Sequence, residues 1–362
     1  MSVILFILVL GVLILVHEFG HFIVAKRLGI RVEEFGIGLP PRAWGIKKGE
    51  TIYSINWLPF GGFVKIFGEN PEEKTISEED KKVSFAWKPK WTQAAVMVAG
   101  VVFNLIFAWL LISVTLISGT FASVELGGAT VENPELMITH VAVNSPAEEA
   151  GVQAGDVILF LDDGKESLQD VDAETVSSFV ASSQGEQITF LVKRGGEQVS
   201  MEVISREGII SGRRAVGVSM SMVGLVKLPF HRAFIEGFKA TVSLTQSAAV
   251  TLWFFVAGFF TGASSLSAIA GPVGIVGMAG DVASLGFVHL LSFMAFLSIQ
   301  LAILNIIPFP ALDGGRLLFL FIEVVIRKPL KPAFVQAAHG FGFMLLILLM
   351  LVVTWNDIMR LF

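Results

Sequence analysis

Long apolar stretches alternate with polar ones along the chain, and the apolar ones have the length of membrane-spanning helices. A helix needs about 20 residues to cross a hydrocarbon core of about 30 Å. Three runs approach or exceed this length, Val3–Ala25, Ala94–Ile117 and Leu290–Ile307, and a fourth, Phe341–Trp355, continues into neighbouring residues. The first run lacks a basic start and carries His and Glu, so we expect it to be retained rather than cleaved as a signal peptide. The pattern predicts four spans.

Basic residues gather in two of the loops between these runs. Residues 26–92 hold 12 of the 26 Lys and Arg residues, and Arg327–Lys331 forms a second basic loop. Because loops rich in Lys and Arg remain in the cytoplasm, both loops are predicted to be cytoplasmic. Both chain termini and residues 120–230 then lie on the extracytoplasmic side.

A further apolar run, Ala248–Phe260, is 13 residues long. This length fits a re-entrant or interfacial segment better than a span. If the run crossed the membrane, the basic loop Arg327–Lys331 would move to the extracytoplasmic side, against the positive-inside rule. We therefore expect the run to remain on one side.

The extracytoplasmic stretch has the alternation and the turns of a small mixed α/β domain. Asp162-Asp163-Gly164 and Gly195-Gly196 form turns, and Ser145-Pro146 begins a short helix that ends near Gly151. In the first cytoplasmic loop, the charged residues 70–82 are predicted to lack regular structure. The predicted strands are Ile138–Val143, Asp156–Leu161, Gln187–Lys193 and Gln198–Ile204, and a second helix is predicted at Asp172–Ala181.

Composition agrees with a membrane protein and narrows the possible chemistry. The 362 residues are 54% hydrophobic and 16% charged, with a mean hydropathy of +0.73, which a soluble domain does not combine with a wettable surface. The net charge of −5 argues against a nucleic-acid partner, which would need a concentrated basic face. The absence of cysteine excludes disulfides, cysteine-bound zinc and thiol catalysis.

One motif inside the first run carries metal-binding groups. In His17-Glu18-Phe19-Gly20-His21 the histidines are four residues apart, so a helix directs both to one face, where they can hold zinc while Glu18 activates water. The alternative is a chance match. Each ionisable group within a span costs about 2.5–3.5 kcal/mol, which a bound metal would offset. His17 lies about 21 Å along the helix from Val3, in the cytoplasmic third of the bilayer.

A catalytic zinc normally takes three protein ligands and leaves one position for water. Asp313 is the strongest candidate for the third ligand. It follows two prolines, Pro308 and Pro310, that must interrupt the helix, and it precedes two glycines that allow close backbone approach. With four spans, Asp313 lies on the same cytoplasmic side as the histidines. The other candidates are Asp281, His289, Glu323, His339 and Asp357.

These motifs together resemble a known family. His17-Glu18-Phe19-Gly20-His21 paired with Leu312-Asp313-Gly314 is similar to the site-2 protease family of intramembrane zinc metalloproteases, in its bacterial branch with an inserted PDZ domain. Each motif alone is modest, and their order along most of the chain is specific. The remaining motifs are Phe35-Gly36-Ile37-Gly38, Pro59–Ile66, Ser145-Pro146-Ala147, Gly155-Asp156-Val157-Ile158 and Gly271–Ile275.

The resemblance implies a Zn²⁺ ion bound by His17, His21 and Asp313, with Glu18 as the base that activates water against a peptide bond. It implies a bacterial inner-membrane enzyme that cuts transmembrane segments of single-pass proteins, such as anti-sigma factors or remnant signal peptides. The expected fold is a polytopic α-helical membrane protein with four transmembrane helices, a membrane re-entrant β-sheet and an inserted extracytoplasmic PDZ-like α/β domain. The expected boundaries are 1–119 and 284–362 for the two halves of the membrane core, 120–228 for the PDZ-like domain and 229–283 for peripheral membrane-associated helices.

Part of the first cytoplasmic loop is expected to assist the substrate. Ile30–Phe35, Thr51–Trp57 and Phe63–Ile66 resemble the family's re-entrant sheet, whose edge could pair with an unwound substrate. An ordinary cytoplasmic hairpin is the alternative. Gly61 and Gly62 of the same segment are assigned to substrate binding.

Polar side chains in the later spans have two interpretations. Asn305, and with less support Gln300, could donate to a substrate carbonyl or a developing oxyanion, or could join helices. Asn104 is predicted to be a helix–helix contact. Two positions depart from the family's pattern. The residues before Asn104, Ala99–Phe103, lack the Gly-Pro that is common in the family, and some relatives carry Asn in place of Gln300. His289 and His339 are expected near helix ends.

Two other functions compete with proteolysis. A catalytically silent scaffold that presents the PDZ-like domain would be expected to lose the metal set, yet His17, Glu18, His21 and Asp313 are all present. A metal transporter would favour further intramembrane His or carboxylates along a path, and few occur. The PDZ-like domain itself could bind peptides or keep bulky ectodomains from the active site. We therefore predict a zinc-dependent intramembrane protease.

Overall fold

A computed structural model describes residues 2–69, 77–123, 132–142, 145–183, 185, 187–210, 213–261, 271–284 and 286–359. The chain forms two compact units. One comprises Met1–Thr115 and Phe230–Phe362, and the other comprises Leu116–Pro229. The domain predicted at 120–228 falls inside the second unit, and the predicted halves of the membrane core fall almost wholly in the first.

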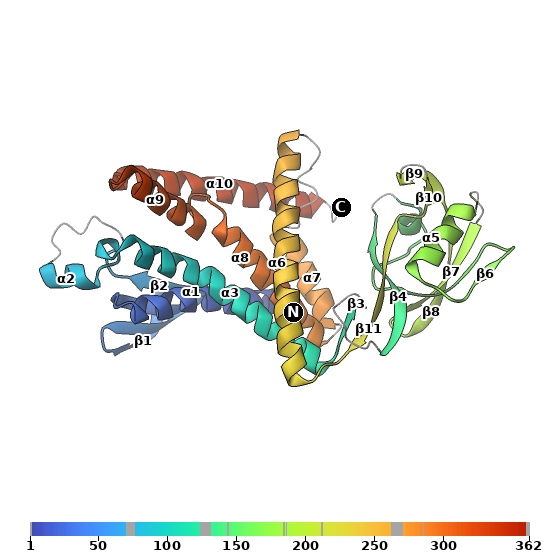
Figure 1. Ribbon diagram of the computed structural model, residues 1–362, viewed down its shortest axis with the longest axis horizontal. Coiled ribbons are helices and arrows are strands. Elements are labelled where there is room, and N and C mark those ends of the chain that lie inside the picture. The colour runs from blue at the N-terminus through green and yellow to red at the C-terminus, as the bar shows by residue number, and fades with distance from the viewer. Residues whose placement is uncertain are drawn as a thin grey trace. The chain divides into compact units, whose positions relative to one another are not determined.

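Among the described residues, five long apolar helices make up most of the first unit (Figure 1). By length and composition, each of them could cross a membrane. The four runs predicted to be spans lie in four of these helices, except that Ile307 is the C-cap of its helix. The five are α1 (Ser2–Arg27), α3 (Lys90–Ser118), α6 (Phe230–Thr261), α8 (Phe287–Ile306) and α10 (Pro332–Met359).

Helix α6 removes the length argument made for Ala248–Phe260, and the position of the run on one side of the membrane stays a prediction. This run is the C-terminal part of a helix of 32 residues that begins at Phe230, so its length does not exclude a crossing. The upstream half carries more polar residues, which hid it from a search for apolar runs, but it contains no proline to end the helix.

Helix α6 contacts α3 near its own N-terminus, where the Trp109 indole N–H of α3 donates to Phe234 O at 2.8 Å. In Figure 1, α6 lies across the direction of α3 and α10 rather than along it.

Two bent strands, β1 (Val32–Lys48) and β2 (Thr51–Ile66), follow α1 and pair with each other twice. Phe35 of β1 is opposite Tyr53 on one side and Val64 on the other. The result is an antiparallel sheet with four segments in the order 62–66, 32–37, 51–56 and 42–48. The three predicted strand segments therefore belong to two longer strands, and segment 62–66 lies at an edge.

Glycines permit the bends of this sheet and its close approach to α1. Gly38 and Gly61 have φ angles of +79° and +73°, a region that side chains disfavour. A methyl group on Gly61 would lie 2.8 Å from Ile14, so β2 packs directly on α1. A small apolar core joins the base of the sheet to α1, α3 and the turn η1 (Phe85–Trp87); its buried members are Ala25, Ile30, Val32, Ile66, Phe85 and Val96.

Two shorter elements of the first unit clarify the loop predictions. The residues 70–76 of the predicted loop lie outside the described ranges, but α2 (Glu78–Val83) is helical because Ser77 caps it and acidic residues occupy its first turn. After α8, the chain breaks at Pro308 and Pro310 as predicted, and α9 (Asp313–Ile326) begins directly at Asp313. The remaining helix is α7 (Pro272–Ser284).

The second unit is a mixed α/β domain around a mainly antiparallel sheet with strand order β3-β11-β4-β5-β7-β8, where β6 also pairs with β5. The four predicted strands correspond to β4, β5, β7 and β8, although Val143 lies outside the described residues. The sequence did not predict β11, in which serine and methionine alternate. The strands are β3 (Thr120–Ser123), β4 (Glu132–Val141), β5 (Val157–Asp162), β6 (Ser167–Leu168), β7 (Gln187–Arg194), β8 (Glu197–Ile204), β9 (Arg206–Ile210), β10 (Arg213–Ala215) and β11 (Val218–Val226), and the helices are α4 (Pro146–Glu149) and α5 (Ala173–Ser182).

Candidate metal centre

Three ligand-type side chains from distant parts of the sequence meet in the first unit. His17 Nε2 lies 2.9 Å from Asp313 Oδ2 and 3.2 Å from His21 Nε2, which is 3.3 Å from Asp313 Oδ2. Both histidines are buried and Asp313 is half-buried. Among the described residues, this is the one group of three or more such side chains whose ligand atoms lie within 4.8 Å of one another.

Local sequence accounts for how each group is presented. His17 and His21 share a face of α1 because they are four residues apart. Asp313 is the first residue of α9, where the helix dipole favours a carboxylate. The next residues, Gly314 and Gly315, pass so close to the carbonyl oxygens of the preceding loop that neither position has room for a side chain. The glycines therefore allow the tight turn that presents Asp313.

Helix α3 holds both imidazoles from the other side. His21 Nδ1 donates to Val96 O at 2.7 Å, which leaves the Nε2 lone pair for a metal. His17 Nδ1 faces the side-chain amide of Asn104 at 3.2 Å. Between these two positions, a methyl group on Gly100 would lie 2.5 Å from His21 Nε2 and 2.7 Å from His17 Nε2. The missing side chain of Gly100 thus leaves the space next to the ligand atoms open.

The three residues fit a zinc ion. Two imidazole nitrogens and one carboxylate oxygen are ligands that catalytic zinc takes, with one position left for water. A tetrahedral ion with bonds of about 2.0–2.1 Å separates its ligand atoms by roughly 3.3 Å. The separations of 2.9, 3.2 and 3.3 Å are close to this value, so the ligand atoms need only small movements to bind the ion.

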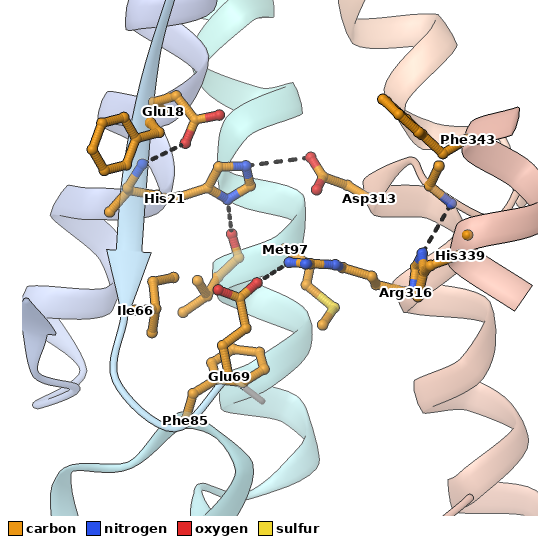
Figure 2. A pocket seen from close by; sticks show the side chains of 15 residues that line it. Glu18, His21, Ile66, Glu69, Phe85, Met97, Asp313, Arg316, His339 and Phe343 are labelled. Atoms are coloured by element: carbon orange, nitrogen blue, oxygen red, sulfur yellow. Dashed lines mark hydrogen bonds and ion pairs between the residues drawn. The ribbon is translucent and has the colours of Figure 1, made fainter. Parts of the chain in front are cut away.

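Glu18 opens onto a cavity of about 570 Å³ that also reaches His21 and Asp313 (Figure 2). Its Oε2 accepts a hydrogen bond of 3.1 Å from the backbone N–H of Val64, on the edge segment of β2. The sheet therefore orients the carboxylate beside the ligand atoms. Further residues that line the cavity are Phe63, Ile66, Glu69, Phe85, Met97, Arg316, His339 and Phe343.

Helices α9 and α10 form the opposite wall of this cavity. Arg316 of α9 forms an ion pair with Glu69, which follows β2 (Figure 2). His339 Nδ1 accepts a hydrogen bond of 2.9 Å from Ala311 N, whose residue has an unusual φ of +85°. His339 lies two turns inside α10, not near its end as predicted, because α10 begins at Pro332. It supports the loop that leads to Asp313.

The glycines assigned to substrate binding pack against α1. A methyl group on Gly61 would lie 2.8 Å from Ile14, and one on Gly62 would lie 3.3 Å from Leu15. Neither glycine is among the residues that line the cavity. Close packing explains why glycine stands at both positions, and their part in substrate binding stays a prediction.

The remaining candidates have separate positions. Asn305 and Gln300 are half-buried on α8, and neither side chain makes a hydrogen bond to a described residue. Glu323 pairs with Lys90. Asp357 accepts hydrogen bonds from the backbone of residues 271 and 274 at the start of α7. His289 is half-buried in the first turn of α8, and the side chain of Asp281 lies outside the described part of the chain.

Asn104 and Gly100 contribute to the site although the sequence did not point to them. The helix–helix contact predicted for Asn104 is confirmed, since its amide on α3 lies 3.2 Å from His17 on α1. The sequence did not predict that this contact is with a candidate ligand. The two residues are four positions apart on α3, the same spacing as the histidines on α1, so they share one face. This spacing in the second apolar run is the signal that could have identified them.

Comparison with known proteins agrees with this geometry. The sequence profile of peptidase family M50 matches residues 5–349. A putative zinc metalloprotease from Clostridium perfringens is 38% identical over 99% of this chain and 98% of its own length. The regulator of sigma-W protease RasP from Bacillus subtilis is 33% identical over 100% and 99%, and the zinc metalloprotease RasP from Oceanobacillus iheyensis is 31% identical over the same shares. The chain belongs to peptidase family M50, the site-2 proteases, and is an integral membrane zinc metalloprotease that acts within the membrane.

Proposed function

We propose that this enzyme hydrolyses peptide bonds inside the transmembrane segments of single-pass membrane proteins, with zinc held by His17, His21 and Asp313. The observation that carries the proposal is the convergence of these three side chains within 3.3 Å beside the cavity that contains Glu18. When bound, zinc would lower the pKa of a water molecule and polarise the substrate carbonyl.

Glu18 is the proposed general base and acid. Its carboxylate takes a proton from the water whose oxygen bonds to the carbonyl carbon. When the carbon–nitrogen bond breaks, the proton passes from Glu18 to the leaving amine. The hydrogen bond from Val64 N to Oε2 leaves the other oxygen, Oε1, free for this transfer. Asn305 is proposed to donate to the substrate from α8, since its amide is not used by a described residue.

The edge of β2 is proposed to receive the unwound substrate. A peptide bond in a helix is shielded by the helix's own hydrogen bonds, so the substrate must be held extended. Among the described residues, segment 62–66 pairs with β1 on one side only, and the Val64 N–H on its other side points to Glu18. A strand added along this edge would pass beside the base and the metal ligands.

The proposed topology has four spans, both termini and the second unit outside, and the active site near the cytoplasmic side of a bacterial inner membrane. His21, late in α1, contacts Val96, early in α3, so these helices run in opposite directions. Asp313 follows α8 and reaches His17, so α8 runs in the direction of α1. If α6 crossed the membrane between α3 and α8, α8 would run opposite to α1. The shared direction of α8 and α1 therefore supports a peripheral position for α6.

The second unit is proposed to be a PDZ-like domain. Its strand β11 pairs with β3 through Val223–Val226, which leaves Val218–Met220 with a single partner strand, β4, among the described residues. Such an edge suits peptide binding by strand addition. A second role compatible with the unit's position in the sequence is to keep large ectodomains of substrates away from the active site. Anti-sigma factors and remnant signal peptides are the proposed substrate classes.

Zinc content and cleavage test the proposal together. In the purified, detergent-solubilised protein we expect about one zinc per chain, and much less in Asp313→Ala. Glu18→Gln should keep its zinc and lose about 10²–10⁴-fold in cleavage of a single-pass model substrate, since the base is removed without a ligand. Full zinc occupancy in Asp313→Ala, or cleavage at wild-type rate by Glu18→Gln, would refute the assigned roles.

A further inference from the structure

Asn104 is completely buried, with 0% of its surface exposed, and its side chain lies against a proposed ligand. Its Nδ2 is 3.2 Å from His17 Nδ1. Its Oδ1 is also buried and has no hydrogen-bond partner among the described residues. A buried amide whose oxygen accepts no hydrogen bond costs free energy. A second state of the site, in which this oxygen has a donor, would offset that cost.

The two states of His17 supply this donor. Without metal, His17 Nε2 lies 2.9 Å from Asp313 Oδ2, so the proton belongs on Nε2 and Nδ1 accepts from the Asn104 amide. When Nε2 binds zinc, the proton must reside on Nδ1, which then becomes a donor. A half-turn of the amide places Oδ1 opposite that donor.

We propose that Asn104 is a positioning residue for zinc, which fixes the tautomer and ring orientation of His17 by accepting the Nδ1 proton in the loaded enzyme. The inference rests on the proposed function, because it takes His17 as a ligand. In this proposal the two histidines are oriented by different kinds of group: a backbone carbonyl, Val96 O, orients His21, whereas the Asn104 side chain orients His17.

A third helix, α8, packs on the backbone of Asn104, and α3 presents the groups that face the two rings. Ser298 Oγ of α8 donates to Asn104 O at 2.8 Å, and both residues are fully buried. Val96, Gly100 and Asn104 are spaced by four residues, so one face of α3 provides the carbonyl for His21, the open space beside both rings and the amide for His17. A helix held at this distance can orient both rings at once.

The test measures the apparent Kd for zinc of the full-length protein in detergent, by competition with a chromophoric chelator. Asn104→Leu has a similar volume and no acceptor, and it should raise the Kd about 10–100-fold, as loss of an orienting partner does. Asn104→Asp keeps an acceptor and should bind zinc at least as tightly as wild type. Cobalt absorption should keep the wild-type spectrum in the Asp variant and change in the Leu variant.

Two further variants make the result specific. Ser298→Ala removes the hydrogen bond to the backbone of Asn104 without touching His17, and it should leave the Kd unchanged. Equal weakening in Ser298→Ala and Asn104→Leu would overturn the inference in favour of helix packing, and so would an Asp variant as weak as the Leu variant. A wild-type Kd in Asn104→Leu, with zinc lost in His17→Ala, would overturn this inference alone. Zinc retained in His17→Ala would instead overturn the proposed ligand set.

Discussion

Individual side chains in the metal centre have environments that a sequence motif does not describe. The histidines are recognisable from their spacing, but each is oriented by a different group of α3: a carbonyl at Val96 and an amide at Asn104. Gly100 matters for the space it leaves, since a methyl group there would lie 2.5 Å from His21 Nε2. Room for the ion is therefore a property of a residue that is not a ligand.

Replacing Gly100 by alanine should displace both imidazoles. We expect zinc per chain to fall well below one and the free energy of unfolding to drop by about 1–3 kcal/mol, because the site becomes overpacked. The matched control is Gly277→Ala in α7, where an added methyl group meets nothing within 4 Å. It should leave the zinc content unchanged and should not lower the free energy of unfolding, because alanine is favoured over glycine inside a helix by about 1 kcal/mol. Wild-type zinc content in Gly100→Ala, measured by metal analysis, would contradict this account of the site.

Among the elements, the bent sheet of β1 and β2 connects the fold to the chemistry. Its edge segment donates from Val64 to Glu18, and its glycines bring it against α1 at Ile14. The strand-like composition of this region was visible in the sequence. The double pairing was not, since it depends on bends at Gly38 and Gly61 that fold each strand back on its partner.

Two glycines of this sheet allow a paired test of that packing. Gly49 and Gly61 both have positive φ angles, +66° and +73°, so alanine at either pays a similar backbone cost of about 1–2 kcal/mol. Only at Gly61 does the new methyl group collide with α1, which adds about 1–3 kcal/mol. Thermal unfolding should therefore show a larger loss for Gly61→Ala than for Gly49→Ala. Equal losses would mean that β2 does not pack on α1 as described.

Helix α5 of the second unit should weaken in acid. Its N-cap, Asp172, accepts hydrogen bonds from Thr175 N, from the Thr175 hydroxyl and from Glu174 N, which lower the pKa of its carboxyl below the ordinary value. Stabilisation from a lowered pKa is present above the unfolded pKa, about 3.9, and is lost as the pH falls through the folded pKa. Hydrogen-exchange protection of residues 173–182 should fall over that range in the full-length protein. In Asp172→Asn, which does not titrate, protection should not change with pH.

At the scale of the whole molecule, the open question is the path of the chain through the membrane. Among the described residues, five helices are long and apolar enough to span, and α6 is the least apolar of them. Length and composition alone do not decide whether α6 crosses. The meeting of Asp313 with His17 favours the proposed peripheral position of α6, because Asp313 follows α8 and His17 lies late in α1, so α8 runs in the direction of α1. A tertiary contact thus constrains the topology that hydropathy leaves open.

Cysteine labelling can test this topology because the natural chain has no cysteine. His231→Cys and Thr261→Cys place a thiol on an exposed residue at each end of α6. With α6 on the outer side, an impermeant maleimide should label both in intact cells, as it should Glu197→Cys in the second unit. Lys48→Cys, at the tip of the sheet that is proposed to face the cytoplasm, should react only after permeabilisation. A Thr261→Cys variant that reacts only after permeabilisation would mean that α6 crosses.

Local properties of the sequence determined the apolar runs, the pair of histidines on one helical face, the break at Pro308 and Pro310, and the family. The first three follow from hydrophobicity, helical spacing or backbone restriction over a few residues, and the family follows from the resemblance of the motifs and their order. The tertiary structure alone decided which polar groups of α3 orient the histidines, that β2 returns to β1 as an edge beside Glu18, and that α6 lies across its neighbours. These features arise where helices and strands distant in sequence pack together, and small residues such as Gly61 and Gly100 set how closely they approach. Close approach depends on two surfaces at once, which no single stretch of sequence contains.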